Sequence, residues 1–537
     1  MSEAAPALAP RPKVNKWLVT LSVTFGTLMG AIDASIVNVA LPHIRGAVGA
    51  TVQEITWIST AFALSTVLVM PLTAFLGRLF GQKRVYMLCL CLFLLGSALC
   101  GTAHSLFSLI AFRALQGFGA GALQPTEQAI LRQTFEPKEQ GMAMALFSLA
   151  VMVGPAIGPT LGGYITDTWS WQWIFYINLP VGALGLLMVA TFVHEDPEIL
   201  AQNRGLAAAQ RKNVDWQGIA LLSVGLASLQ YFLEEGARDD WFDSRAITAA
   251  FGLSVVALIA FIMRELSCPA PAVNVRLFKD RVFLSGTLIG SVMFGMLMAN
   301  IFLLPVFMQE LLGFDATQAG IALMPRALVM MVVTPIIGRI YNHVSPRLLI
   351  GVGVLFFCYG AFAMSQMTLQ SGRADVTTTI AIQGIGFACL FVPLTTTALS
   401  AIPRHLLADA TGLNSLFRQV GGSIGLAIFA TLLGVYTVDA RASIGAHVVI
   451  TRPEVQARLA DLQHGLMARG VDAYTAHARA LQALAGGVAR QASNLAFDRA
   501  FLAAGFAFLL VLPLLTFLKV VRSPVPVESG SSQHVEL

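Results

Sequence analysis

Long apolar stretches recur along the whole chain, and each is long enough to cross a lipid bilayer. A membrane-spanning helix needs about 20 mostly apolar residues. By this criterion the sequence predicts fourteen spans, at residues 17–40, 54–76, 84–103, 105–128, 141–165, 171–193, 216–235, 246–266, 283–308, 318–340, 348–368, 376–399, 412–436 and 499–521. Inside the bilayer a backbone must satisfy its own hydrogen bonds, so each span is expected to be an α-helix. The chain is therefore predicted to be an all-α integral membrane protein in contact with lipid.

The composition excludes a soluble globular protein. Of the 537 residues, 56% are hydrophobic and only 12% are charged, whereas soluble domains carry about 25% charged residues. The six cysteines show neither paired spacing nor metal-ligand spacing, so we expect no metal site. The formal net charge of +5 predicts no nucleic-acid partner, because the basic residues are distributed by membrane topology.

The basic residues of the short connections predict the orientation in the membrane. Cytoplasmic loops of membrane proteins are enriched in Lys and Arg. With fourteen spans, the connections on the side of the two termini contain twenty Lys and Arg residues, and the short loops opposite contain four. Both termini, predicted as tails 1–16 and 522–537, are therefore expected in the cytoplasm.

One connection is much longer than the others. Residues 437–498 lie on the outer side, before the last span. Pro453 predicts a helix start, apolar residues at helical spacing follow as far as Leu466, and a second amphipathic stretch covers about 472–486. The pattern suits a lid packed on the outer mouth, and it suits a docking surface for another protein equally.

Two repeated motifs predict an internal duplication. A Gly-Arg pair ending at Arg78 recurs at Arg339, 261 residues later, and a Gln-Gly pair starting at Gln116 recurs at Gln383, 267 residues later. Two six-helix halves related by an axis along the membrane normal are a known transporter plan, with binding sites near the midplane between the halves.

The duplication also predicts the domain organisation. The halves would cover residues 17–193 and 283–521, the second half including the loop 437–498. Residues 194–282 would form a linker that holds the seventh and eighth spans as two inserted helices.

Ionisable side chains inside the spans are the first candidates for function, because such groups are costly in lipid. Asp33 in the first span is a candidate proton site, or a structural hydrogen-bond acceptor near the outer mouth. Arg113 in the fourth span needs an anionic or carbonyl partner if it is buried, and both Asp33 and Glu127 qualify. Arg418 and Arg326 are further cations inside spans, of which Arg418 is the stronger functional candidate because Asn414 and Gln419 accompany it. We expect Asp33, Arg113, Glu127 and Arg418 to take part in proton coupling.

Two further sets of residues are expected to matter. A run rich in Gly and Pro in the fifth span predicts a helix that can kink and pack closely, or plain membrane packing; its members are Gly154, Pro155, Gly158, Pro159, Gly162 and Gly163. The polar residues expected to line a substrate cavity are Asn38, Gln116, Gln124, Asn300, Gln383 and Asn414.

These motifs resemble those of the major facilitator superfamily, and within it the fourteen-helix drug:proton antiporters of the EmrB/QacA group. The resembling segments are the first-span run around Asp33, the fourth-span run 113–121, the fifth-span run 154–163 and the sixth-span run 173–182. The runs 235–242, 277–279 and 393–397, together with the long last outer loop, resemble the EmrB-like members most closely. The resemblance covers about residues 17–521.

The resemblance implies a major facilitator fold and a multidrug efflux function driven by the proton gradient, with no other cofactor. It further implies hydrophobic small-molecule substrates, a bacterial inner membrane, a periplasmic adaptor (EmrA-like) and an outer-membrane channel (TolC-like). The alternatives are a proton-coupled transporter of one metabolite and, in a different class, a membrane enzyme or receptor. The sequence contains no His-Glu-x-x-His run and no phosphate-binding loop, so we expect no enzymatic activity and no ATP-driven transport.

The sequence departs from the wider family in the loop between the second and third spans. Ala74 stands where the family usually has a glycine, and Arg78 stands where it has an acid, before Gly81 and Arg84. In the family this loop belongs to the conformational machinery, and its acid helps to hold the two halves together on the cytoplasmic side. That contact is therefore not carried over to Arg78, although EmrB-like members also lack the acid.

Overall fold

The computed structural model describes residues 15–518 except 137 and 196. Most of the predicted tail 1–16 and the whole tail 522–537 lie outside these residues. So do Arg11, Lys13, Lys519 and Arg522, four of the twenty basic residues assigned above to the side of the two termini. Within the described part of the chain, fourteen helices are long and apolar enough to cross a membrane, which confirms the predicted number of spans.

The N-terminal half is a bundle of six spans, and short helices interrupt two of them. Its helices are α1 (Lys16–Val48), α2 (Val52–Ile55), α3 (Trp57–Val69), η1 (Met70–Leu72), α4 (Thr73–Phe80), α5 (Gln82–Gly101), α6 (Leu106–Thr134), α7 (Gln140–Thr168), α8 (Trp173–Tyr176) and α9 (Asn178–Phe192). The second span is built from α2, α3, η1 and α4, and the sixth from α8 and α9.

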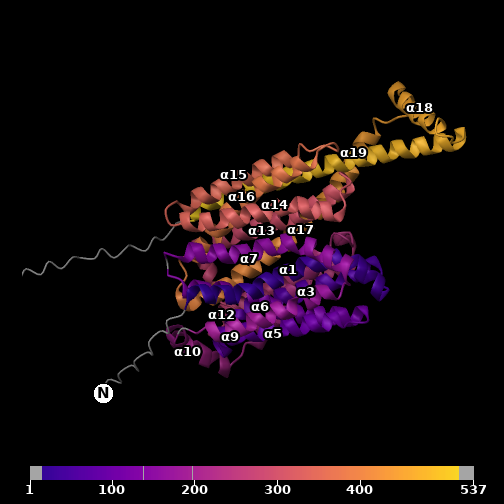
Figure 1. Ribbon diagram of the computed structural model, residues 1–537. Helices are drawn as coiled ribbons and strands as arrows, with labels where there is room; N and C mark the ends of the chain where they lie inside the picture. The colour runs from indigo at the N-terminus through magenta and orange to yellow at the C-terminus, as the bar shows by residue number, and fades with distance from the viewer. Residues whose placement is uncertain (1–14, 137, 196, 519–537) are drawn as a thin grey trace, which may run out of the picture.

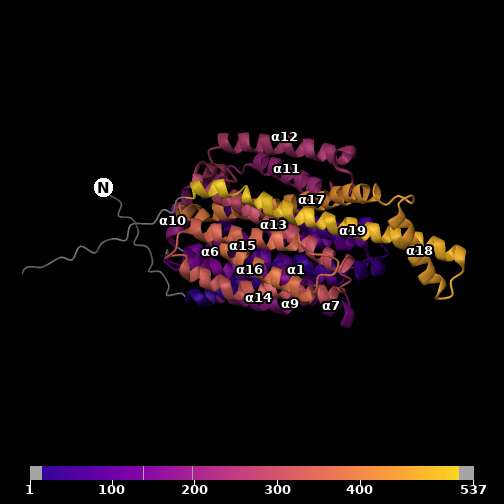
Figure 2. The same ribbon diagram turned by 90° about the horizontal axis from the view of Figure 1, so that it is seen from above.

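The predicted linker contains the two inserted spans and a surface helix. Its helices are α10 (Pro197–Lys212), α11 (Trp216–Glu235), η2 (Trp241–Asp243), α12 (Arg245–Ser267) and η3 (Val275–Lys279). Figure 2 shows α11 and α12 at one edge of the bundle, with α11 between α12 and the rest. The most apolar window of α12 is only 22% buried, as expected of a helix that faces lipid.

The C-terminal half repeats the six-span plan. Its helices are α13 (Arg281–Glu310), α14 (Ala316–Ile340), α15 (Pro346–Met364), α16 (Arg373–Ala398), η4 (Arg404–Leu406), α17 (Leu407–Gly445), α18 (Pro453–Met467), α19 (Ala473–Leu509) and η5 (Leu512–Phe517). Asp280 caps α13 and Asp315 caps α14, each accepting a hydrogen bond from a backbone N–H of the first turn.

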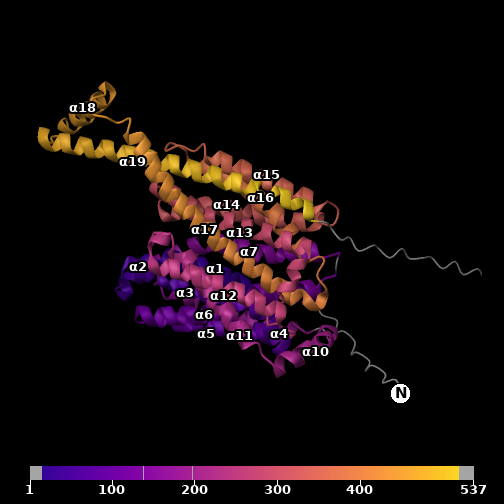
Figure 3. The same ribbon diagram turned by 180° about the vertical axis from the view of Figure 1, so that it is seen from behind.

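The two ends of the bundle differ. The end at which the described chain begins and ends, here called the termini side, also holds α10 and α4 (Figures 1 and 3). At the opposite end, the α18 side, α18 and the first part of α19 extend beyond the bundle (Figures 1 and 2).

The long connection is a helical hairpin. As predicted, α18 begins at Pro453, and Leu459 of its apolar face is buried. The small residues Ala476 and Ala480 of α19 are also fully buried, in the stretch that packs against α18. Residues 499–509 of the predicted last span, 499–521, are the final part of α19, which already begins at Ala473; η5 follows, and residues 519–521 lie outside the described part of the chain.

Hydrogen bonds between the halves concentrate on the termini side. In the described residues they join Arg78 to Asp409, Arg132 to the Leu399 carbonyl oxygen, and Asn342 to the Lys138 carbonyl oxygen. In addition, η1 and α4 pack against α17 there. The structure is therefore closed between the halves at the termini side.

Candidate functional site

A buried polar network around Asp33 lies inside the N-terminal half. Asp33 is 0% exposed and Arg113 is 1% exposed, and Arg113 Nη1 lies 2.6 Å from Asp33 Oδ2. The side-chain amides of Gln116 and Asn178 each donate to Asp33 Oδ1 at 2.9 Å. Both amides also donate to the Ser97 hydroxyl at 2.9 Å. Of the two acids left open by the sequence, Asp33 is the partner of Arg113.

Small residues of α6 bring this network together. A Cβ at Gly117 would lie 2.9 Å from Ser65 Cβ of α3, and one at Gly96 of α5 would lie 2.7 Å from the Gln116 backbone. Only glycine allows these helix backbones to approach so closely. Arg113 therefore reaches the interior, where its guanidinium lies 4.2 Å from the Phe62 ring centroid.

Glu127 lies on α6, as Arg113 does, but far from the Asp33 network along the helix. It is fourteen residues after Arg113, which corresponds to ~21 Å along a helix axis. Its Oε1 accepts a hydrogen bond from Thr24 at 2.8 Å, whereas its buried Oε2 has no hydrogen-bond partner within the described chain. No Lys or Arg of the described part forms an ion pair with Glu127. A carboxyl group in such a place is stable in its neutral, protonated form.

Arg418 and Arg326 are buried without an acidic partner among the residues that the structure covers. Arg418 Nη2 donates to Ser415 Oγ at 3.2 Å, and Arg326 Nη2 donates to Gln383 Oε1 at 3.2 Å. In each guanidinium a fully buried nitrogen lacks a hydrogen-bond partner within the described chain: Nη1 in Arg418 and Nε in Arg326. Arg113 has a carboxylate partner, whereas these two arginines have only neutral hydrogen-bond acceptors.

Arg78, at the departure from the family pattern, joins three parts of the chain. Its Nη1 lies 2.6 Å from Asp409 Oδ2 of the C-terminal half, and its Nε donates to Gln210 Oε1 of α10 at 3.0 Å. Nη2 donates to the Ala272 carbonyl oxygen of the linker at 3.3 Å. The two halves are therefore held together by a charge pair in which the N-terminal half supplies the cation.

The other residues of this loop lie beside that pair. Gly81 has φ +90°, a left-handed conformation that favours glycine, and it forms the turn between α4 and α5. Arg84 is exposed. A cavity of about 570 Å³ opens next to Arg78 and Asp409, and α4, α6 and α10 contribute most of its wall.

The Gly and Pro run of the fifth span faces α1. A Cβ at Gly154 would lie 2.6 Å from Ala31 Cβ, and one at Gly162 would lie 2.8 Å from Ile36 Cγ1. Gly158 is equally close to Ser35 of α1. The helix α7 remains continuous through Pro155 and Pro159, which are half-buried, and Gly163 is half-buried as well. The three glycines at four-residue spacing thus form one contact surface, α1 against α7.

The residues predicted to line a substrate cavity lie in several environments. Asn38 is exposed on α1 and accepts a hydrogen bond from Ser59, and Gln124 is half-buried. Gln116 belongs to the Asp33 network and Gln383 holds Arg326. Asn300 and Asn414 are buried, and each has one amide atom without a partner. A role in substrate binding stays a prediction for all six.

Several residues of these sites escaped the sequence reasoning. Asn178 lies in a run that the resemblance quotes, but nothing in the sequence connects it with Asp33. Ser97 lies unmarked within an apolar stretch, and Asp409 lies at a span end, where acids are common. Only Asp409 could have been singled out from the sequence. It is the single acid in the described segment that joins α16 to α17 and in the first turn of α17.

One sequence pattern has a purely structural explanation. Residues 421–425 read Gly-Gly-Ser-Ile-Gly, the spacing of the serine-hydrolase nucleophile turn, which requires a strand followed by a helix. Here the run lies inside α17. A Cβ at Gly421 would lie 2.8 Å from the Ser291 carbonyl carbon of α13, so this run serves close helix packing.

Comparisons with known proteins agree with the observed architecture. The family model described as Major Facilitator Superfamily matches residues 23–426. The multidrug export protein EmrB of Haemophilus influenzae is 34% identical over 415 residues, which cover 76% of this chain and 79% of that protein. EmrB of Escherichia coli K12 is 35% identical over 418 residues, covering 77% and 80%. The fatty acid resistance protein FarB of Neisseria gonorrhoeae is 35% identical over 414 residues, again covering 77% and 80%.

Solved structures of transporters share the fold. The human organic anion transporter MFSD10 (TETRAN) superposes with a TM-score of 0.58 at 15% sequence identity, covering 94% of this chain and all of that one. The proton:xylose symporter XylE superposes with a TM-score of 0.57 at 11% identity, covering 94% and 99%. Taken together with the fourteen spans and the two six-span halves, these matches establish that the chain is a multi-pass membrane protein of the major facilitator superfamily and belongs to its EmrB-like group.

Proposed function

We propose that this protein is a proton-driven exporter of hydrophobic or amphipathic small molecules that works by alternating access. The observation on which the proposal rests is the buried Asp33–Arg113 network, because an ionisable cluster inside lipid-embedded helices is retained for a function. The names of the relatives, which include two multidrug export proteins, support the export of drugs.

Asp33 and Glu127 have different tasks in this proposal. Asp33 accepts hydrogen bonds from three donors, of which Arg113 is charged, so both of its oxygens are already occupied. Glu127 has one buried oxygen without a partner and, among the described residues, no cation paired with it, so we assign it the role of a neutral acid. Glu127 therefore binds the transported proton, and Asp33 orients Arg113 and the outer part of the N-terminal half.

Burial of Glu127 couples the proton to the conformational cycle. In the state closed at the termini side, the dry surroundings of Glu127 select the protonated form. When the halves part on that side, water reaches the carboxyl group and the proton leaves. Each charge that crosses a potential of 100 mV supplies about 2.3 kcal/mol for this cycle.

The proposed location is the inner membrane of a bacterium, with the termini side in the cytoplasm. The excess of Lys and Arg in the short connections of that side supports the orientation. The hairpin of α18 and α19 then extends into the periplasm (Figure 1), where an EmrA-like adaptor could bind it and connect the protein to a TolC-like channel. A hairpin that extends away from the bundle favours docking over a lid.

Proton flux in proteoliposomes tests the proposal. The purified protein is reconstituted with a pH-sensitive dye inside, and an outward movement of protons is followed after addition of a hydrophobic drug. Wild-type protein should give a drug-dependent flux. Glu127→Gln should abolish that flux while drug still binds, because the glutamine mimics the permanently protonated acid.

Two comparisons make the result decisive. Asp33→Asn should lower both drug binding and flux, because it leaves the buried guanidinium of Arg113 without a charge partner. Glu139→Gln, which removes a half-exposed acid that pairs with Lys16, is the matched control and should retain the flux. Full drug-driven flux in Glu127→Gln would remove Glu127 from the coupling role, and no flux in the wild type would refute proton-driven export.

A further inference from the structure

Arg418 lies at the contact between the two halves. It belongs to α17 of the C-terminal half and is 3% exposed. Its guanidinium carbon lies 5.4 Å from the ring centroid of Phe147 in the N-terminal half and 5.3 Å from that of Phe391 in the C-terminal half. The two rings are 6.2 Å apart. Arg418 therefore lies beside a pair of aromatic rings, to which each half contributes one ring.

The positive charge of Arg418 is incompletely satisfied. Ser415 Oγ accepts one hydrogen bond, Nη1 has no partner, and no carboxylate of the described chain forms an ion pair with it. By contrast, the buried Arg113 and Arg78 each have an Asp at 2.6 Å. A buried cation without an anion costs several kcal/mol, so an anion that reaches Arg418 during the cycle gains strong binding.

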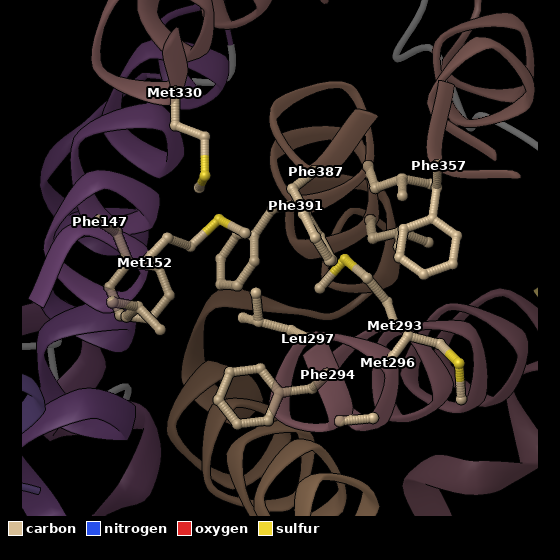
Figure 4. Packing of buried hydrophobic residues seen from close by; sticks show 14 of the residues in the cluster. Phe147, Met152, Met293, Phe294, Met296, Leu297, Met330, Phe357, Phe387 and Phe391 are labelled. Carbon is tan, nitrogen blue, oxygen red and sulfur yellow. The ribbon is translucent and has the colours of Figure 1, made fainter. Parts of the chain in front are cut away.

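The two rings beside Arg418 belong to an adaptable apolar surface. We call it the Met–Phe cluster. Figure 4 shows Phe147 and Met152 of α7 facing Phe391, Met330 and Leu297 of the C-terminal half. The buried members of the cluster are Phe147, Met152, Met293, Phe294, Met296, Leu297, Met330, Phe387 and Phe391. Methionine side chains are flexible and polarizable, so such a surface can repack around apolar bodies of different shape.

We propose that Arg418 binds the carboxylate of amphipathic organic acids, whose apolar body lies on the Met–Phe cluster. The guanidinium fork of arginine matches a carboxylate with two parallel hydrogen bonds. Since Phe147 belongs to one half and Phe391 and Arg418 to the other, a movement of the halves separates the rings and exposes Nη1. The site would therefore open and close with the transport cycle.

This assignment rests on the proposed export function and moves Arg418 from proton coupling to substrate binding. The two roles predict different results. A coupling residue is needed for every substrate, whereas a carboxylate-binding residue is needed only for anionic ones. Probes that share one apolar body and differ in charge therefore distinguish the roles.

The experiment uses the purified full-length protein and a matched pair of probes, 2-naphthylacetate and 2-(2-naphthyl)ethylammonium. Binding is measured by naphthyl fluorescence, and proton-driven uptake is measured in inside-out proteoliposomes. Arg418→Gln should weaken binding and uptake of naphthylacetate at least tenfold and change those of the ammonium probe less than twofold. Arg418→Lys should keep part of the naphthylacetate binding, because a point charge replaces the fork only partly.

Arg326→Gln is the matched control, because Arg326 is also buried without an acidic partner among the described residues, while its guanidinium contacts Gln383 and Phe387, both of the C-terminal half. It should leave the ratio between the two probes unchanged. Equal losses of both probes in Arg418→Gln would restore the coupling role, and equal retention would exclude any role in binding. Competition by naphthyl phosphate as strong as by naphthylacetate would overturn the preference for a carboxylate. Failure of proton-driven uptake in the wild type, with naphthylacetate binding that depends on Arg418, would refute the export function and leave the binding site standing.

Discussion

Breaking the ion pair between Arg78 and Asp409 should open the protein at the termini side. The side chains are 6% and 1% exposed, and Asp409 Oδ1 already lacks a hydrogen-bond partner within the described chain. Arg78→Met keeps an unbranched side chain about as long as the aliphatic stem of the arginine and removes the charged guanidinium. The Asp409 carboxylate would then remain buried without a counter-charge in the closed state.

The size of the effect follows from the difference between two states. Removing one member of a buried ion pair costs about 3–5 kcal/mol, and the slight exposure of Arg78 favours the lower end. Once the halves part, water reaches both groups, and the loss of the pair costs about 0–1 kcal/mol. The closed state is thus weakened by about 2–3 kcal/mol, which shifts the equilibrium roughly 30- to 140-fold toward the open state.

Cysteine alkylation measures this shift. Thr73 of α4 is buried, and its Oγ1 lies 3.0 Å from where a Cβ at Gly412 of α17 would stand, so the parting of the halves exposes it. In a background without the native cysteines, Thr73→Cys should react slowly with a hydrophilic maleimide. Adding Arg78→Met should raise the alkylation rate by about the factor of the shift, until the open state dominates.

Two further variants decide whether the ion pair is the cause. Arg84→Met removes an exposed arginine from the same loop and should leave the alkylation rate unchanged. The exchange Arg78→Asp with Asp409→Arg should recover part of the protection that either single substitution loses. An alkylation rate in Arg78→Met equal to that of the parent protein would refute the reasoning. So would an exchange variant as open as the single variants.

Three other predictions address the remaining sites. Arg113→Ala should lose transport more severely than Arg113→Lys in a vesicle uptake assay, because lysine can replace the charge beside Asp33 but not the fork; near-normal uptake by both would favour a packing role. Gly158→Leu should stop transport while the protein still inserts, whereas Gly163→Leu, with its nearest neighbour 3.9 Å from the Cβ position, should be tolerated; similar uptake by both variants would contradict a need for close α1–α7 contact. Deleting residues 446–486 should keep vesicle transport, and abolish both cellular drug resistance and cross-linking to the adaptor; a collapse of vesicle transport with surviving cross-linking would establish the lid instead.

The transmembrane helices could be predicted from the sequence because lipid imposes a simple rule on length and polarity. The predicted 216–235 coincides with α11, and 246–266 differs from α12 by one residue at each end. The prediction was less accurate where a helix continues beyond the lipid. The span predicted at 412–436 belongs to α17, which extends to Gly445, since hydropathy reports the membrane-embedded part and not the helix end.

The partners of the buried charges could not be predicted in the same way. The sequence singled out Arg113 and left two possible acids, because the rotation of α1 against α6 depends on side-chain packing that periodicity does not encode. Close approach at Gly96 and Gly117 fixes α6 against α5 and α3, and the packing of α1 beside them brings Asp33, not Glu127, to the guanidinium. Ser97 was invisible for a related reason: a hydroxyl in an apolar span is usually bonded to its own helix.

The family departure at Arg78 shows why a motif must be considered together with its partner. An arginine in place of the usual acid removes a contact only if the residue facing it stays the same. Here the facing residue is Asp409, so the halves attract each other through a pair in which Arg78 supplies the cation. One residue of the motif alone therefore could not decide whether the halves are held together.

The position of the counter-charge determines what each buried arginine does during transport. Arg113 pairs with Asp33 of its own half, so their distance stays fixed as the halves move and the pair stabilises the half itself. Arg78 pairs with Asp409 of the other half, so the pair exists in one state only and sets the balance between states. Arg418 has no acidic partner in either half within the described residues, so in the proposed role an anion from outside the chain completes the hydrogen bonding of its guanidinium. Giving Arg418 a permanent counter-charge should therefore remove its role. An acid introduced beside Arg418 would pair with the guanidinium and should abolish the binding of carboxylates while leaving the fold intact.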